Sequence, residues 1–378
     1  MLVRIPSRSK DSKANCHLCG KTLNGVGTCI GICPHCLRIK PEESRHIIEL
    51  VHAQSREMFG LPAKAAADPD GITCNLCVKN CRLTETRKGY CGIRKGSRQS
   101  LRTDGRSRAQ VSYYYDPLPT NCVADWVCPG GTGVGYPQYS NDSGPEVGFY
   151  NLAVFFEACN FNCLYCQNWT FRKTQLCSSK WSSVDTLKKA VKPDTSCICF
   201  FGGDPGPQLP YALRLSESVR RENPEKILRI CWETNGAMKP SWLKKMVRIS
   251  SQSGGCIKVD LKAWNEGIHR ALCGCGNREV LENFKRIADL ASDRPAPPLL
   301  VASTPLVPGY IDTDEIYALA TFIARINPDI PYALLAFAPQ FLMDDSPTTS
   351  AAQGEACIEA AKQAGLKRVR LGNTHFLS

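Results

Sequence analysis

Cysteine spacing is the feature that most constrains this chain. The sequence contains 22 cysteines among 378 residues, and in its first half they fall into short groups. Five lie between Cys16 and Cys36, four between Cys74 and Cys91, and three more follow near residue 160. Disulfide frameworks belong mainly to small secreted domains with little core, whereas 43% of this chain is hydrophobic. The groups therefore indicate metal or iron–sulfur ligation rather than disulfides.

Charge and hydropathy disfavour several classes of partner. Lys and Arg give a formal net charge of +12, but they are scattered along the chain instead of forming a stripe. Nucleic acid is therefore a disfavoured partner. No apolar run approaches the roughly 20 residues that cross a bilayer. Residues 1–13 are basic and polar, without the apolar core of a secretion signal. We expect a cytoplasmic protein with no membrane partner.

The first cysteine group has the spacing of a structural zinc site. Cys16-His-Leu-Cys19 and Cys33-Pro-His-Cys36 form two thiol pairs separated by a short Gly-containing stretch. Two such pairs are typical of a tetrahedral zinc ribbon. Cys29 and the two histidines are then spare, or Cys29 replaces one ligand. Because so short a segment has little core of its own, the metal would supply its folding free energy.

A second group of four cysteines follows a predicted helix over residues 42–61 and a linker over residues 62–71. Its members are Cys74, Cys77, Cys81 and Cys91. Four sulfurs at this spacing can close a zinc site or an iron–sulfur cluster, and spacing alone does not separate the two. We favour zinc. The roles of Cys122 and Cys128 stay open between ligands and loop residues near an active site.

The third group is the sharpest motif. Cys159, Cys163 and Cys166 lie within eight residues, directly after an apolar run over residues 150–156 that predicts a buried strand. Three sulfurs can hold three corners of a cubane cluster and leave one iron open to a ligand. The spacing resembles the signature of the radical S-adenosylmethionine (SAM) superfamily. The resemblance implies a [4Fe-4S] cluster on these cysteines, SAM on the open iron, and Tyr165 packed beside the adenine.

Three later motifs strengthen the resemblance. Gly202-Gly203-Asp204-Pro205 resembles the Gly-Gly-Glu-Pro segment that holds the methionyl amino group, with Asp204 in place of the usual glutamate. Glu233-Thr234-Asn235-Gly236 resembles a segment near the ribose, and Asp260-Leu-Lys262 one that reaches SAM and its surroundings. The resemblance implies a SAM site formed by Tyr165, Gly202, Gly203, Asp204, Glu233, Thr234, Asn235, Asp260 and Lys262.

From residue 150 onward, apolar strand patterns alternate with amphipathic helix patterns. We expect strands near residues 150–158, 196–201, 228–234, 256–261, 298–303, 331–337 and 367–371. Such alternation predicts an α/β fold with a parallel sheet, and the motifs fall at carboxyl ends of strands. The resemblance implies a partial (β/α)6 TIM-like barrel. The expected domains are a zinc-ribbon-like module with a helix at 1–61, a second cysteine-rich segment and connection at 62–145, and the radical SAM barrel at 146–378.

Within the superfamily, the chain resembles pyruvate formate-lyase (glycyl-radical enzyme) activating enzymes and archaeal AmmeMemoRadiSam-associated relatives. The resemblance implies an oxidoreductase that cleaves SAM to a 5′-deoxyadenosyl radical, which abstracts hydrogen from a glycine of a partner protein. Flavodoxin or ferredoxin would be the electron donor. The rival hypotheses are modification of a small metabolite, peptide side chain or tRNA, and a zinc-ribbon binding protein with an inactive barrel. The intact Cys159, Cys163 and Cys166 argue against the inactive barrel. The sequence does not determine whether SAM is consumed or regenerated.

Overall fold

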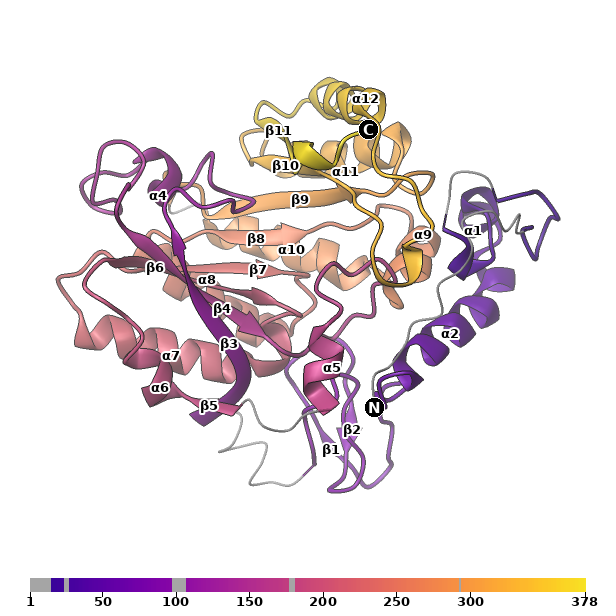
Figure 1. Ribbon diagram of the computed structural model, residues 1–378, viewed down its shortest axis with the longest axis horizontal. Coiled ribbons are helices and arrows are strands. Elements are labelled where there is room, and N and C mark those ends of the chain that lie inside the picture. Colours follow the sequence, from indigo (N-terminus) through magenta and orange to yellow (C-terminus); the bar gives the residue numbers. More distant parts are fainter. Residues whose placement is uncertain (1–14, 24–26, 97–106, 177–180, 292–293) are drawn as a thin grey trace.

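The chain from residue 108 onward is built on one large open sheet (Figure 1). A computed structural model describes residues 15–23, 27–96, 107–176, 181–291 and 294–378. The strand order within these residues is β11-β10-β9-β8-β7-β6-β4-β3-β5. The parallel strands are β4 (Tyr150–Phe156), β6 (Thr195–Gly202), β7 (Arg229–Thr234), β8 (Ile257–Asp260), β9 (Leu300–Leu306), β10 (Tyr332–Ala336) and β11 (Val369–Gly372). They match the seven expected strand ranges, which confirms the α/β fold class.

Helices join consecutive parallel strands, as the alternating pattern predicts. They are α6 (Val184–Lys188), α7 (Leu209–Glu222), α8 (Pro240–Ser253), α10 (Arg278–Ala291), α11 (Thr313–Ile326) and α12 (Ala351–Gln363). Figure 1 shows α7, α8 and α10 behind the strands. α8 illustrates the local signals: it begins at Pro240, whose missing N–H suits a first helical position, and ends before Gly254 at φ 75°.

Two antiparallel strands extend the sheet and were not expected. β3 (Arg108–Pro117) pairs with β4, and β5 (Trp181–Ser183) pairs with β3. The chain between β3 and β4 includes α4 (Pro129–Thr132) and packs Ala124 and Val127 against Cys256 and Val301. This segment therefore packs against the sheet near the amino-terminal ends of β8 and β9. Near its end, the fully buried Glu146 forms an ion pair with Arg229 at 2.5 Å.

The N-terminal extension packs against the sheet domain. It contains η1 (Thr28–Ile30), α1 (Pro34–Ile39), α2 (Pro41–Glu57), β1 (Ile72–Thr73) and β2 (Arg82–Leu83). Figure 1 shows α1 and α2 beside α9 (Glu266–Cys273), which lies between β8 and α10. Leu37 and Ile48 belong to the same hydrophobic cluster as the sheet core. His52 Nε2 lies 3.0 Å from the carbonyl oxygen of Ala271.

The described residues also contain four short elements, namely α5 (Phe171–Leu176), η3 (Gly206–Gln208), η4 (Phe341–Met343) and η5 (Thr374–Phe376). The expected helix over residues 42–61 is α2, which ends at Glu57. Among the described residues, no helix is both long enough and apolar enough to span a bilayer.

Candidate functional site

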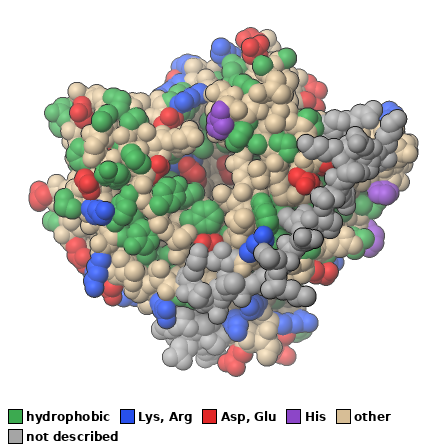
Figure 2. All heavy atoms as spheres, in the orientation of Figure 1, with side chains coloured by type: hydrophobic (Ala, Val, Ile, Leu, Met, Phe, Trp, Pro, Cys, Tyr) green, Lys and Arg blue, Asp and Glu red, His purple; other side chains and the backbone are tan. Residues whose placement is uncertain are grey.

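A cavity of about 310 Å³ lies at the carboxyl ends of the parallel strands. Figure 2 shows a hollow near the middle of this face of the molecule, with charged side chains among hydrophobic ones. Every residue of the expected cluster and SAM sites lines this cavity: Cys159, Cys163, Tyr165, Cys166, Gly202, Gly203, Asp204, Glu233, Thr234, Asn235, Asp260 and Lys262. Residues from four separate sequence motifs thus meet in one place.

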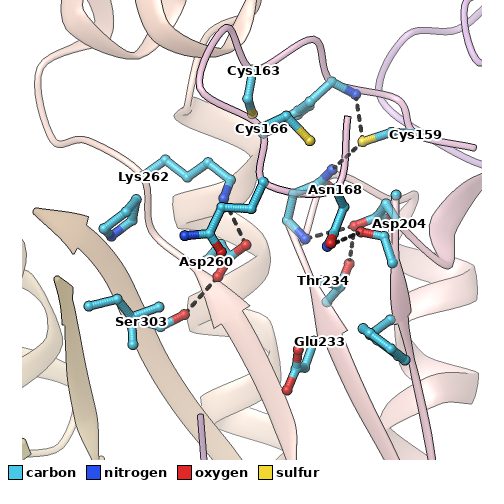
Figure 3. Close-up of a pocket in the computed structure, with 18 of the residues that line it drawn as sticks. Cys159, Cys163, Cys166, Asn168, Asp204, Glu233, Thr234, Asp260, Lys262 and Ser303 are labelled. Carbon is cyan, nitrogen blue, oxygen red and sulfur yellow. Dashed lines mark hydrogen bonds and ion pairs between the residues drawn. The ribbon is translucent and has the colours of Figure 1, made fainter. Parts of the chain in front are cut away.

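The loop after β4 presents three thiols to the cavity (Figure 3). The backbone N–H groups of Asn162 and Leu164 donate to carbonyls of Cys273 and Leu272 at 3.0 Å, which fixes the loop against α9. Burial raises the pKa of Cys159 and Cys166. A hydrogen bond with Cys273 lowers the pKa of Cys163 to about 7. Since none of the three is in a disulfide, this donor set fits three corners of an iron–sulfur cluster.

Asp204 organises the side of the cavity next to Cys159. Its Oδ2 accepts from the backbone N–H of Asn235 at 2.8 Å and from Thr234 Oγ1 at 2.9 Å, while Oδ1 accepts from Gly206 N at 2.7 Å (Figure 3). A carboxylate has about four acceptor positions, so one is left for a ligand. Burial raises the pKa of Asp204 to about 6, although these hydrogen bonds oppose the rise.

Asp260 and Lys262 form a charged pair on the opposite side of the three thiols. Lys262 Nζ lies 2.8 Å from Asp260 Oδ2, and Ser303 Oγ donates to Asp260 Oδ1 at 2.7 Å (Figure 3). Burial would lower the pKa of Lys262, but the neighbouring Asp260 and Cys163 raise it. The ammonium therefore stays charged at the cavity wall, where Lys262 Nζ is 6.0 Å from the Tyr165 ring.

Glu233 takes part in a buried polar cluster that sequence reasoning missed. Lys258 Nζ lies 3.0 Å from Glu233 Oε1, 2.9 Å from Cys122 Sγ and 3.3 Å from Cys199 Sγ. Lys258 lines the cavity and is 3% exposed at its side chain. Because Lys258 lies within an apolar strand, the sequence alone did not mark it as a cavity residue. The available signal was its alternation with Asp260, which places both side chains on one face of β8.

Cys122 is placed here next to Lys258, close to the cavity, whereas Cys128 packs in the segment between β3 and β4. Near later strand ends, Ser303 and Pro305 also line the cavity, but His375 is exposed beside Phe376. Arg172 is a further lining residue that the sequence did not single out. Cys177 lies outside the described residues.

The first cysteine group is assembled as a four-thiol site. The sulfurs of Cys16, Cys19, Cys33 and Cys36 all lie within 4.8 Å of one another, a spacing that can hold a metal ion. Burial acts against ionisation of Cys16, but backbone N–H groups, including that of Cys33, lower its pKa to about 6. Cys29 is buried outside the group.

The second group is buried around one small cavity. Cys74, Cys77, Cys81 and Cys91 line it together with Tyr90 and Arg94. Burial raises the pKa of Cys77 to about 12 and that of Cys91 to about 11. Among the described residues, the 4.8 Å spacing of metal ligands is met by the first group and not by these four sulfurs. Metal or cluster binding at the second group, and the preference for zinc there, stay predictions.

Comparison with known proteins assigns the sheet domain. Residues 153–323 match the Radical SAM superfamily. The chain carries a radical SAM domain. An uncharacterised protein of Methanocaldococcus jannaschii, MJ0808, is 24% identical over 313 residues, covering 81% of this chain and 82% of that protein.

Two further relatives are activating enzymes that match a smaller part of this chain. The isethionate sulfite-lyase activating enzyme of Desulfovibrio desulfuricans is 32% identical over 36% of this chain and 40% of its own length. The pyruvate formate-lyase 1-activating enzyme of Escherichia coli is 27% identical over 39% of this chain and 58% of its own length. The chain is thus an enzyme with activating-enzyme relatives, and its family implies a [4Fe-4S] cluster and SAM.

Proposed function

We propose that this radical SAM enzyme generates a radical on a partner protein by abstracting hydrogen from a glycine. Cys159, Cys163 and Cys166 would hold the [4Fe-4S] cluster. When bound and reduced, the cluster would supply the electron that cleaves SAM to methionine and a 5′-deoxyadenosyl radical. The observation that carries the proposal is the meeting of these thiols with the three strand-end motifs in one cavity.

The chain's own residues would bind and orient SAM around the cluster. We assign the methionyl ammonium to the free acceptor position of Asp204, with Gly202 and Gly203 giving close backbone approach. Glu233, Thr234 and Asn235 would face the ribose. Asp260 and Lys262 would contact the far side of SAM, and Tyr165 would pack against its adenine.

The glycyl target is supported by the relatives. The two activating enzymes compared above are named for isethionate sulfite-lyase and pyruvate formate-lyase. Both matches cover less than two thirds of those enzymes, so the substrate is assigned here by analogy. A flavodoxin or ferredoxin is the proposed electron donor. We also propose zinc at Cys16, Cys19, Cys33 and Cys36, and a second zinc at the group that begins at Cys74.

The chemistry is tested by anaerobic reconstitution with iron and sulfide, followed by dithionite and SAM. We expect 5′-deoxyadenosine and methionine by chromatography, and we expect Cys163→Ala to abolish both products. Cys357→Ala is the matched control, because this buried thiol lies in α12 away from the cavity and should leave the rate unchanged. Product formation by Cys163→Ala at the wild-type rate would refute the cluster assignment.

The substrate is tested with a candidate glycyl-radical enzyme deuterated at glycine. We expect deuterium in 5′-deoxyadenosine and a new electron paramagnetic resonance (EPR) signal on the partner protein. Deuterium arriving instead from a labelled metabolite, peptide side chain or tRNA would replace the glycyl assignment with one of those substrates.

A further inference from the structure

We propose that Arg172 is a positioning residue that tunes the iron–sulfur cluster: its buried guanidinium donates N–H groups to cluster sulfur and makes the cluster easier to reduce. The inference rests on the proposed function, because it requires a cluster at the three cavity thiols. It assigns a role to a residue outside all of the sequence motifs.

Burial and missing partners are the first observations. Arg172 is 1% exposed and lines the same cavity as the three thiols. Within the described residues its Nε and Nη1 are buried without a hydrogen-bond partner. A buried polar group without a partner destabilises the folded chain, and more so when it is charged. A ligand that accepts hydrogen bonds at this place removes that cost.

The cluster thiols are electrostatic neighbours of Arg172. Electrostatic interactions join Arg172 to both Cys163 and Cys166. Cluster sulfur accepts hydrogen bonds, and such bonds together with local charge set the reduction potential. Because reduction adds one electron, a fixed positive charge and N–H···S bonds stabilise the reduced form more than the oxidised form.

The guanidinium is held in place from two sides. Its Cζ lies 4.7 Å from the ring centroids of Phe171 and Phe341. Its Nη2 donates to Asn162 Oδ1 at 3.4 Å. Asn162 is fixed in turn by α2, because its Nδ2 lies 2.9 Å from His52 Nδ1 and 2.6 Å from Ser55 Oγ. The N-terminal extension thus orients the amide that holds Arg172.

The test compares Arg172→Gln and Arg172→Lys with the wild-type chain, all reconstituted anaerobically. Iron is counted first, and the cluster is then titrated with reductant while its reduced form is followed by EPR. We expect Arg172→Gln to lower the ratio of reduced to oxidised cluster about tenfold at a fixed potential, which corresponds to about 59 mV for one electron. Arg172→Lys keeps the charge but lacks the planar donor fork, so it should give a smaller shift in the same direction.

Lys173→Gln is the control, since it removes the charge of the next residue, which is half-buried and lies over the Trp169 ring. Its potential should match wild type. An unchanged potential in Arg172→Gln overturns the inference, as does an equal shift in Lys173→Gln. If Arg172→Gln binds no iron, an unchanged reduction potential in Arg172→Lys overturns the inference. Loss of iron from both folded Arg172 variants also overturns it, because Arg172 is then a structural support. A wild-type chain without a cluster refutes the proposed function instead.

Discussion

At the scale of single residues, Asp204 gives the sharpest expectation for cofactor binding. Asp204→Asn keeps the size, but its NH2 group cannot accept the two hydrogen bonds now made to Oδ2, and the variant lacks the negative charge that would attract a SAM ammonium. Hydrogen bonds to charged groups contribute about 1.5–3 kcal/mol. We therefore expect SAM affinity to fall about tenfold or more in equilibrium binding. Asp329→Asn, at an exposed pair with Lys367, is the control and should bind normally.

The same carboxyl predicts a pH dependence. Its pKa is raised from 3.8 to about 6 by burial. Between these values the folded chain holds a proton that the unfolded chain has lost, so this group's contribution to stability falls as pH rises from about 4 to about 6. The ionised form binds an ammonium, so SAM affinity should weaken as pH falls below about 6. A profile of affinity that is identical in wild type and Asp204→Asn would contradict this role.

At individual positions, the sequence predicted which side chains meet in the cavity but not which hydrogen bonds and ion pairs they form. Motifs at strand ends had to converge, because parallel strands bring their carboxyl ends to one edge. Lys258 and Arg172 were not predicted as cavity residues, for a different reason. The partners of Lys258 depend on the register between β7 and β8, and the surroundings of Arg172 depend on the packing of Phe341 and α2. Neither is encoded in local spacing.

At the scale of elements, the segment between β3 and β4 depends on one buried ion pair. Glu146 is fully buried and accepts from Arg229 and Ser196. Glu146→Gln leaves the Arg229 charge without its counter-ion, which costs about 3–5 kcal/mol in buried pairs. We expect that loss in urea unfolding. Glu266→Gln, at an exposed pair of the same length, should cost at most about 1 kcal/mol. Equal losses in the two variants would mean that burial of the Glu146 pair does not matter.

This pair also sets a pH window for stability. Burial acts to raise the pKa of Glu146, but the Arg229 interaction outweighs it and lowers the value to about 2. Its stabilising contribution is present above the ordinary value of 4.5 and is lost as pH falls toward about 2. Unfolding curves of the wild type should lose this contribution over that range. Glu146→Gln should show a shallower dependence.

Strands and helices were predictable where the strand–helix alternation repeats, and they were missed where it does not. Apolar strands alternating with amphipathic helices identified every parallel strand that the structure describes. β3 was missed because Val111 to Tyr115 carries several tyrosines of mixed exposure, and its antiparallel pairing with β4 breaks the repeating pattern.

At the scale of the whole molecule, the N-terminal extension is connected to the cavity through packing and hydrogen bonds. Leu37 and Ile48 lie in the main hydrophobic cluster, and His52 reaches the cysteine loop through Asn162. Packing is therefore continuous across the expected domain boundary at residue 61. That boundary stays a proposal, and it divides the sequence into modules without dividing the core. Metal bound near Cys16 would support α2 and, through it, the loop of Cys159.

Metal content tests this arrangement for the whole chain. Reconstituted protein should contain about four iron atoms and one or two zinc atoms, because one cubane and one or two four-thiol sites are expected. Cys16→Ser with Cys19→Ser should remove one zinc by mass spectrometry while iron stays near four. It should also lower the unfolding temperature, since the metal supplies folding free energy to a segment with little core. Unchanged zinc in that variant would disprove the first site, and about eight iron atoms would show that Cys74 to Cys91 holds a second cluster.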